Sequence, residues 1–280
     1  MMLLFCILCA FLTINVRLTL GNNNEWDLLI FTQHWPITVC TEWQESKVDN
    51  ECRLPPKKNL WTVHGVWPTR MGTIGPAYCN NSWPFEPKKL SPILNELQVY
   101  WINIEANTPP YSFWQHEWSK HGTCAAELDS LNNELNYFKT GLQWIQLYGM
   151  GNILAKANIK PDSKGYNIYE IYGAIKKLMH KNPVVECVWD KKLKALLLSE
   201  IRICFDKKLT LIDCDGVKEM FENVKDINGI LTNCDPNQSI MYYNKVPVLK
   251  RLVVETESSK YYKQLLQLYN TIQYLIWFTF

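Results

Sequence analysis

The cysteine content of this chain constrains its fold more than any other feature. The 280-residue sequence contains ten cysteines, of which Cys6 and Cys9 lie in an apolar N-terminal segment. Without that segment, eight cysteines remain, from Cys40 to Cys234. An even number in an exported chain predicts four disulfide bonds, although spacing alone allows on the order of 100 connectivities. The eight include no Cys-x-x-Cys pair, which excludes a zinc ribbon.

The N-terminal segment has the pattern of a secretory signal. An apolar run covers residues 3–14, Arg17 ends it, and small residues near Gly21 provide a cleavage point. The run is too short to cross a bilayer as a helix. We therefore predict a signal peptide over residues 1–21. The mature protein is then secreted to the extracellular space or delivered to the lysosomal lumen.

The charge and length of the chain limit its function and its domain number. The formal net charge is only +2, which is not the footprint of a protein that binds nucleic acid through a basic surface. A nucleic-acid ligand would therefore have to bind in a local pocket. Roughly 260 mature residues are enough for one large domain or two small ones. The sequence shows no low-complexity linker and no internal repeat, and Pro55-Pro56 and Pro109-Pro110 are typical of loops inside a domain.

Local patterns predict both helices and antiparallel strands, and hence an α+β fold with a central antiparallel sheet flanked by helices. Strands are expected at residues 28–31 and 60–63, and a hairpin at residues 200–205 and 209–212. A tight turn in this hairpin would pair Cys204 with Thr210. Helices are expected at residues 91–101, 131–147 and 167–180, the last with Asn167 and Glu170 as its N-terminal capping pair.

Two short segments about 50 residues apart carry the chemistry. Residues 61–68 read Trp-Thr-Val-His-Gly-Val-Trp-Pro, and residues 113–124 read Phe-Trp-Gln-His-Glu-Trp-Ser-Lys-His-Gly-Thr-Cys. Together they hold three of the five histidines. Histidine both gives and takes protons near neutral pH. Aromatic rings beside histidine, lysine and glutamate indicate a site that stacks a planar ligand and handles negative charge. In the first segment, Gly65 allows close approach of the backbone.

The second segment is predicted to be a continuous helix with one chemical face. At 100° per residue, Glu117, Lys120 and His121 fall within roughly 140° of arc together with His116 and Cys124. A charged, solvated face would not explain the flanking tryptophans. A zinc site is the sharper alternative, but His116 and His121 are five residues apart and about 140° apart on an α-helix, so one metal fits poorly. We predict no metal ligands.

These two segments resemble the two signature segments of the ribonuclease T2 family. The first signature usually reads His-Gly-Leu-Trp-Pro, so Val66 is a mild departure, and the second is highly specific. Residues 33–36 resemble the first core strand of the family, and residues 81–85 resemble its animal members. The resemblance covers roughly residues 26–243. It implies a disulfide-stapled ribonuclease T2-like fold with a catalytic domain over residues 22–244.

The resemblance also implies a reaction and residue roles. In the family, the ribose 2′-OH of RNA attacks phosphorus and the 5′-oxygen leaves, which produces a 2′,3′-cyclic phosphate without a metal or another cofactor. By this resemblance, His121 is the base and His64 is the acid that protonates the leaving oxygen. Glu117 and Lys120 polarise the phosphate and stabilise the phosphorane. His116 holds the phosphate.

The base-binding residues follow from the same resemblance. Trp67 and Phe113 match positions that line base pockets, and Gln33 is a further candidate. Many members, especially fungal ones, carry an aspartate shortly after the first signature, where it helps to select the base. Here Thr69 follows Pro68, so the resemblance does not fix the base preference.

The resemblance selects one disulfide connectivity among the many that the spacing allows. The four implied pairs are Cys40–Cys52, Cys79–Cys124, Cys187–Cys234 and Cys204–Cys214. The pair Cys79–Cys124 would anchor the end of the catalytic helix. Asn80 and Asn237 begin Asn-x-Ser triplets and are predicted glycosylation sites. His34 and His180 are interpreted as structural or surface residues.

The C-terminal extension, residues 245–280, has no counterpart in the resemblance. Residues 260–280 are helix-like and rich in aromatic side chains but contain Gln264, Gln267, Asn270 and Gln273, so they are too polar for a membrane span. A docked amphipathic helix, an interfacial membrane segment and a disordered tail remain open.

The sequence therefore predicts a monomeric, secreted or lysosomal acid endoribonuclease that acts on single-stranded RNA. The alternative is an exported binding or signalling protein that uses the same fold and whose nuclease activity is secondary. The presence of every catalytic residue implied by the resemblance favours the enzyme.

Overall fold

The computed structural model describes residues 24–47, 49–73, 75–162, 164–217, 225–247, 261 and 264–269. The predicted signal peptide lies outside the described residues. The chain divides into two units, Met1–Val246 and Pro247–Phe280. The first unit contains the sheet, all four disulfides and every predicted site residue.

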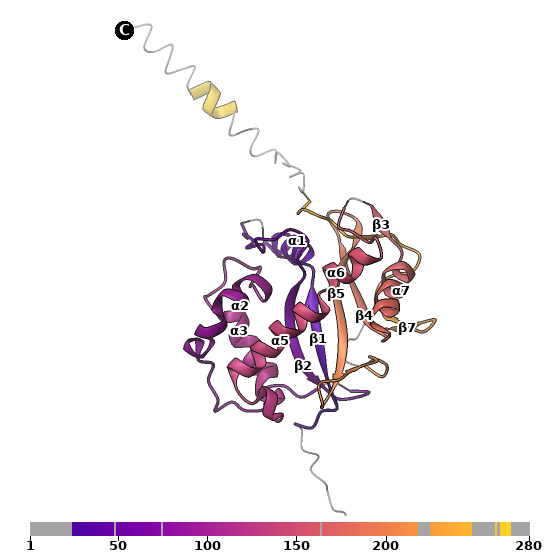
Figure 1. The fold of residues 1–280 in the computed structure, drawn as a ribbon. Helices are drawn as coiled ribbons and strands as arrows, with labels where there is room; N and C mark the ends of the chain where they lie inside the picture. Colours follow the sequence, from indigo (N-terminus) through magenta and orange to yellow (C-terminus); the bar gives the residue numbers. More distant parts are fainter. Residues whose placement is uncertain are drawn as a thin grey trace, which may run out of the picture. The chain divides into compact units, whose positions relative to one another are not determined.

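A mixed sheet forms the centre of the first unit (Figure 1). Its strands are β1 (Leu28–His34), β2 (Thr62–Thr69), β3 (Gly165–Tyr166), β4 (Val184–Asp190), β5 (Ala195–Asp206), β6 (Leu211–Ile212), β7 (Lys225–Ile227), β8 (Ile230–Thr232) and β9 (Ile240–Met241). The main path runs β2-β1-β5-β4-β8-β7. The central pairings are antiparallel as predicted, whereas β4 with β8 and β5 with β9 are parallel.

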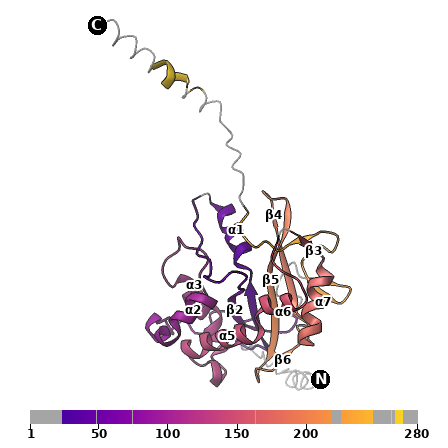
Figure 2. The same cartoon turned by 45° about the horizontal axis from the view of Figure 1, so that its top comes forward.

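Helices flank this sheet, which confirms the predicted α+β class. The α-helices are α1 (Pro36–Ser46), α2 (Leu94–Tyr100), α3 (Ser112–Glu117), α4 (Thr123–Ala125), α5 (Glu134–Tyr148), α6 (Met150–Lys156) and α7 (Ile168–Met179). The other helical turns are η1 (Pro87–Ile93), η2 (Trp118–Gly122) and η3 (Asp129–Leu131). Figures 1 and 2 both show α2, α3 and α5 on the β2 side of the sheet, with α6 and α7 on the β5 side.

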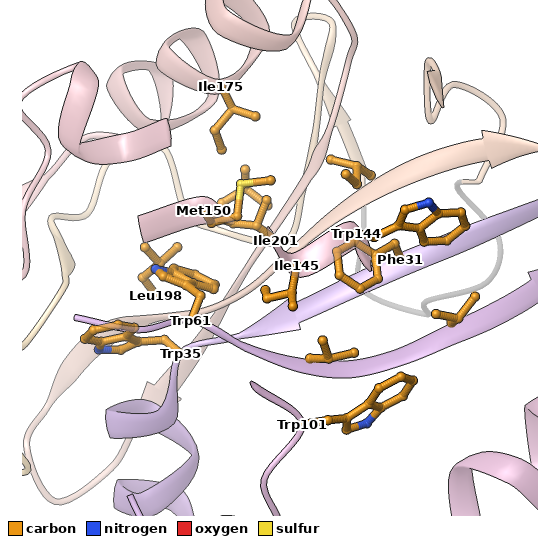
Figure 3. Close-up of a cluster of buried hydrophobic side chains, with 14 of the residues drawn as sticks. Phe31, Trp35, Trp61, Trp101, Trp144, Ile145, Met150, Ile175, Leu198 and Ile201 are labelled. Carbon is orange, nitrogen blue, oxygen red and sulfur yellow. The ribbon is translucent and has the colours of Figure 1, made fainter. Parts of the chain in front are cut away.

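The main core lies on one face of the central strands. Leu29 and Phe31 alternate along β1 and face this core, as does Ile201 from β5. The ring of Phe31 meets Trp144 of α5 edge-on at 5.5 Å between centroids (Figure 3). The aromatic content of the sequence is therefore mainly core, because most of the tryptophans fill this face.

The other face of β1 changes from apolar to polar along the strand. Leu28 and Ile30 belong to a second, smaller buried cluster that includes Trp67. Thr32 and His34 continue the same face and are also buried. The functional residues collect at this polar end.

The helices predicted at residues 91–101, 131–147 and 167–180 are present with different boundaries. The α7 helix begins after Asn167, which forms the predicted capping box with Glu170. The α5 helix ends at Tyr148, followed by Gly149. Residues 91–101 form the end of η1 and then α2, because Pro92 lies inside a 3₁₀ turn.

The predicted hairpin forms as β5 and β6, and β6 ends before Cys214, but the turn between the strands is not tight. Cys204 pairs with Ile212 and not with Thr210. Within the longer connection, Leu209 adopts the left-handed conformation, with φ of 61°. The loop closes where the backbone N–H of Asp206 donates to the carbonyl of Thr210 at 3.0 Å.

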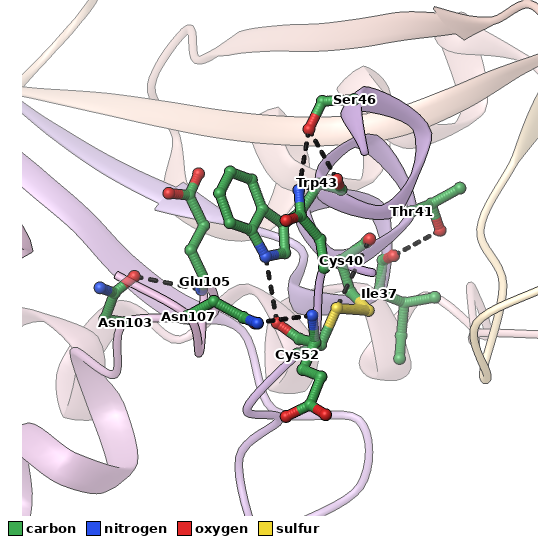
Figure 4. The surroundings of a disulfide bond; sticks show 11 residues. Ile37, Cys40, Thr41, Trp43, Ser46, Cys52, Asn103, Glu105 and Asn107 are labelled. Atoms are coloured by element: carbon green, nitrogen blue, oxygen red, sulfur yellow. Dashed lines mark hydrogen bonds between the residues drawn. A yellow bond between two sulfur atoms is a disulfide. The ribbon is translucent and has the colours of Figure 1, made fainter. Parts of the chain in front are cut away.

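All four implied disulfides are present in the structure. They join Cys40 to Cys52, Cys79 to Cys124, Cys187 to Cys234 and Cys204 to Cys214. Figure 4 shows the first, which ties α1 to the loop after it. Beside it, the indole N–H of Trp43 donates to the carbonyl of Glu51 at 3.0 Å. Two of the four bonds therefore join a loop to a helix, at Cys40 and Cys124, and two join a loop to a strand, at Cys187 and Cys204.

The second unit is described only at residues 247, 261 and 264–269, and of these 261 and 264–269 are helical. Its exposed apolar side chains include Leu265, Leu268 and Tyr269. Among the described residues, no helix is both long enough and apolar enough to cross a membrane.

Candidate active site

His64 lies in a β-bulge of β2. Thr32 of β1 pairs with Gly65 and Gln33 pairs with Val63, so His64 is an extra residue without a partner on β1. A bulge re-aims side chains and is frequent beside active sites. Here it places His64 and Gly65, although consecutive, on the polar face of the sheet. Val63, on the opposite face of the sheet, stays in the main core.

The second segment is not the continuous α-helix that we predicted. It consists of α3, a π-helical turn at η2, and the short α4. A π turn inserts an extra residue per turn, so residues five apart lie nearly one above the other. The 140° separation expected for His116 and His121 was therefore wrong, and their ring centroids lie 6.4 Å apart.

A neighbouring chain segment holds this π turn. The backbone N–H of Tyr78 donates to the carbonyl of Lys120 at 3.0 Å. The next residue, Cys79, is disulfide-bonded to Cys124 at the end of the turn. The segment around Cys79 is therefore fixed to the catalytic helix at two adjacent points.

Trp67 lies between the two predicted catalytic histidines. Its ring meets His64 edge-on at 4.9 Å and His121 at 5.3 Å. Its indole N–H donates to Oε2 of Glu117 at 2.9 Å. Trp67 is only 7% exposed, so it separates the histidines and holds Glu117. Phe113 is half-buried on α3, with its ring 5.9 Å from that of His64.

The two histidines have opposite electrostatic environments. Burial disfavours the charged form of His64, but Glu200 outweighs this effect and raises its pKa above the ordinary value. The Nδ1 atom of His64 lies 2.5 Å from Oε1 of Glu200. Burial lowers the pKa of His121 well below the ordinary value, and Lys120 lowers it further. The pKa values of the two rings are therefore shifted in opposite directions, upward for His64 and downward for His121.

The other two polar residues of the helix complete this pattern. Burial raises the pKa of Glu117 to about 7, against the opposing effects of His64 and the Trp67 hydrogen bond. The side chain of His116 is largely exposed, but the part of its ring that is buried lowers its pKa, and the charge of Lys120 lowers that pKa further. Lys120 is half-buried on η2 beside these groups. The structure thus brings His64, Glu117, Lys120 and both helix histidines together.

Gln33 does not reach the site, contrary to our prediction. It has no exposed surface, and its amide group is fully used by the backbone. Its Nε2 donates to the carbonyl of Tyr148 at 2.9 Å, and its Oε1 accepts from the N–H of Met150 at 3.0 Å. It fastens β1 to the α5–α6 junction because odd positions of β1 face the core.

The next residue, His34, takes the place at the site that we had assigned to Gln33. Its ring stacks against that of His64 at 5.3 Å between centroids. Burial lowers the pKa of His34 to about 3, so the ring is neutral. The sequence interpretation of His34 as structural therefore omitted its position beside the acid. Its place one residue along an alternating strand was the signal that could have revealed it.

A cavity of about 400 Å³ opens beside His64. Its wall includes the ring of Phe113, the ring of His34, and the polar side chains of Asn103, Glu105 and Glu42. Glu117 and Glu200 reach its edge. A planar group stacked on Phe113 in this cavity would lie beside the proton donor.

Two groups of side chains have donor atoms within 4.8 Å of one another. One consists of His34, His64 and Glu200, and the other of His116, Glu117 and His121. The second set exists because of the π turn. Each set contains at least one residue of the two histidine segments.

Sequence reasoning missed the charged residues of β5 and β4. Glu200 and Arg202 alternate on β5, and Arg202 forms an ion pair with Glu186 of β4. Two charges separated by one residue within an apolar strand were the available signal, since such positions share one face of a sheet.

A comparison with known protein families shows the family of the chain. Residues 26–214 match the model of the ribonuclease T2 family. The chain belongs to this family. That range contains both histidine segments and the whole ion-pair chain of β4 and β5.

Relatives and solved structures agree with the family. Ribonuclease Oy of Magallana gigas is 42% identical, over 71% of this chain and 91% of its own length. Ribonuclease T2 of Sus scrofa is 38% identical, over 68% of this chain and 90% of its own. The crystal structure of human RNase T2 aligns with a TM-score of 0.63 and 32% identity, covering 78% of this chain and 99% of that one. This ribonuclease T2 family member is an acid endoribonuclease.

Proposed function

We propose that this enzyme cleaves single-stranded RNA by transphosphorylation, with His121 as the general base and His64 as the general acid. One observation carries the assignment: the two imidazoles flank Trp67 and their pKa values move in opposite directions. A base must be free of its proton and an acid must hold one at the same pH. The raised pKa of His64 and the lowered pKa of His121 support this division of roles.

The proposed reaction needs two proton transfers and no metal. His121 takes the proton of the ribose 2′-OH while the 2′-oxygen attacks phosphorus. The bond from phosphorus to the 5′-oxygen breaks, and His64 gives its proton to that oxygen. The products are a 2′,3′-cyclic phosphate and a free 5′-hydroxyl.

Three further side chains are assigned to the phosphate. Lys120 supplies positive charge where the phosphorane becomes negative. Glu117 is largely neutral below pH 7, so its O–H can donate to a phosphoryl oxygen while Trp67 holds its other oxygen. His116 is exposed at the mouth of the site and is positioned to hold the ground-state phosphate.

The cavity beside His64 is the proposed place for a base. Phe113 provides a flat apolar wall, and stacking on such a ring stabilises any base without selecting its sequence. The carboxylate of Glu105 and the amide of Asn103 lie on the same wall. Thr69 is fully buried at the end of β2 and does not line this cavity.

The remaining properties extend the same proposal. We assign residues 1–21 as a signal peptide, 22–244 as the catalytic domain, and 245–280 as an extension. Four disulfides support export to the extracellular space or the lysosomal lumen, since such bonds persist in oxidising compartments. Asn80 and Asn237 are exposed, as glycosylation requires. The enzyme is proposed to act as a monomer.

Digestion of a defined single-stranded oligoribonucleotide tests this function. The wild-type enzyme, with and without EDTA, should leave 2′,3′-cyclic phosphate ends identified by mass spectrometry. His64→Ala and His121→Ala should each lower kcat by about 10² to 10⁴-fold. His180→Asn is the matched control, because His180 is exposed at the end of α7 in a left-handed conformation that asparagine tolerates. Near wild-type kcat in either alanine variant would contradict the assignment.

A further inference from the structure

A chain of buried charges leads across the sheet to His64. Arg202 is 4% exposed and forms an ion pair with Glu186 on the adjacent strand β4. It also donates twice to Oε2 of Glu200, from Nη2 at 2.6 Å and from Nε at 3.1 Å. The other oxygen of Glu200 contacts Nδ1 of His64 at 2.5 Å. The order of contacts is therefore Glu186, Arg202, Glu200, His64.

The sheet is irregular at both ends of the final contact. His64 is the extra residue of the bulge in β2. Against β4, Glu200 pairs with Glu186 while Leu198 pairs with Cys187, which leaves Ser199 as an extra residue of β5. Glu200 also pairs with His34 on β1, the strand that lies between β5 and β2. Two bulges thus direct two side chains toward each other across the strand that separates them.

Stability alone does not account for this arrangement. A buried ion pair is a weak stabiliser and is often replaced by apolar residues without loss of stability. The guanidinium of Arg202 fixes one oxygen of Glu200 and leaves the other for a single ring nitrogen. Such an arrangement controls the orientation of a ring, as carboxylates do for histidine elsewhere.

We propose that Glu200 is a positioning residue for RNA cleavage, held by Arg202, whose carboxylate accepts the Nδ1–H of His64 and thereby directs Nε2 at the leaving oxygen. This inference rests on the proposed function, because it takes His64 as the general acid. In the transfer, Nε2 gives its proton to the 5′-oxygen as the bond from phosphorus to that oxygen breaks. Nδ1 keeps its proton, so His64 ends neutral and still donates to Glu200.

The charged groups around His64 support the same role. The carboxyl groups that face it are Glu200 from β5, Glu117 from α3, Glu186 from β4 and Glu105 from the loop before α3. The groups that oppose its charge are Arg202, His34, His116 and His121. Glu200 is the largest of the favourable contributions to the raised pKa of His64. Arg202 in turn lowers the pKa of Glu200 despite burial, so Glu200 stays ionised.

Glu200→Gln in the full-length enzyme tests the proposal. The amide keeps the size of the side chain and an oxygen that can accept from Nδ1, but it removes the charge. The pKa of His64, measured by NMR titration of its ring and assigned by comparison with His64→Ala, should fall by about one to three pH units. The alkaline limb of the kcat/KM profile should move to lower pH, because His64 must be protonated. The acid limb, which reports the base, should stay in place.

Glu186→Gln is the matched control. It removes a buried carboxylate from the same chain of charges but leaves the contact between Glu200 and His64 intact. Its effect on the titration of His64 should be much smaller. An unchanged His64 titration in Glu200→Gln, or a uniform loss of rate at all pH values, would overturn the proposal in favour of a structural role for Glu200.

Two further results keep the test decisive. If Glu200→Gln does not fold, Glu200→Asp retains the charge at a greater distance and should show a smaller shift of the same sign together with a lower kcat. An unshifted His64 titration there would also overturn the proposal. The proposed function is tested separately by His64→Ala, and it fails if this variant keeps the wild-type kcat. The titration of His64 tests only the contact with Glu200, because it does not depend on which residue is the acid.

Discussion

Replacement of Gly65 by alanine should disable the site through a single methyl group. Gly65 lies beside His64 in the bulge, with its α-carbon facing the hydrogen bond between Trp67 and Glu117. A Cβ at this position would come within 2.8 Å of Cε2 of Trp67, and closer still to Nε1 of Trp67 and Oε2 of Glu117. Carbon atoms pack at about 3.5–4.0 Å, so both side chains must move apart.

The magnitude follows from the contacts that are lost. A hydrogen bond between neutral groups contributes about 0.5–1.5 kcal/mol, and an extra methyl group in a packed site typically adds about 1–3 kcal/mol of strain. The free energy of unfolding should therefore fall by about 2–4 kcal/mol, which for a domain of this size is a Tm decrease of roughly 10 °C. Displacement of Glu117 by about 1 Å should lower kcat/KM by on the order of 10²-fold.

The same substitution at Gly173 provides the control. Gly173 lies in α7, and a Cβ there would meet no atom within 4 Å. Gly173→Ala should stabilise the protein by up to about 1 kcal/mol, because alanine favours the helix, and should leave cleavage unchanged. Thermal unfolding and steady-state cleavage of one oligoribonucleotide measure both effects. If Gly65→Ala kept wild-type Tm and kcat/KM, the close packing of Gly65 against Trp67 and Glu117 would be refuted.

Three other substitutions probe separate parts of the structure. His34→Gln should reduce the dependence of stability on pH. The pKa of His34 in the folded protein is about 3, below the ordinary value of 6.5, so the folded protein binds fewer protons than the unfolded chain. The wild type therefore loses stability as the pH falls from 6.5 toward 3. In urea unfolding, the wild type should lose up to about 3 kcal/mol more of its free energy of unfolding than this variant between pH 7 and pH 4. Parallel pH profiles of the two proteins would refute the buried neutral ring. Lys120→Ala should lower kcat more than it raises KM, because the phosphorane charge develops only in the transition state; a change in KM alone would contradict this role. The double variant Cys79→Ala/Cys124→Ala should lose about 4 kcal/mol of stability, since the bond closes a separation of 45 residues, and should also lose kcat at a temperature where it remains folded. Unchanged kcat there would show that the bond stabilises the fold without positioning the helix.

Local signals in the sequence predicted what local chemistry determines. The capping pair Asn167 and Glu170 located the start of α7, because both hydrogen bonds form within one turn of chain. The class of fold followed from the mixture of helical and strand patterns. The four disulfide pairs did not follow from spacing, and only the resemblance to a family distinguished them from the alternatives.

The same local reasoning failed at the π turn. An assumption of 100° per residue placed His116 and His121 far apart, whereas η2 brings their rings to 6.4 Å. Within the segment, the hydroxyl of Thr123 donates to the carbonyl of Ser119 at 2.9 Å, but a hydroxyl bonded to a carbonyl four residues earlier is also common in regular helices. The π turn is held from outside, by the N–H of Tyr78 and the disulfide from Cys79, which lie about 40 residues earlier in the chain. Such support is invisible to any periodicity count.

The departures from regular structure coincide with the chemistry, and this explains why two identical imidazoles behave differently. The bulge at His64 and the bulge at Ser199 aim a ring and the carboxylate of Glu200 at each other, while the π turn brings His121 close to His116. The contact with Glu200 raises the pKa of His64, whereas burial, Lys120 and His116 lower the pKa of His121. The contacts that shift the two pKa values apart therefore arise at two β-bulges and a π turn, which local sequence patterns do not report.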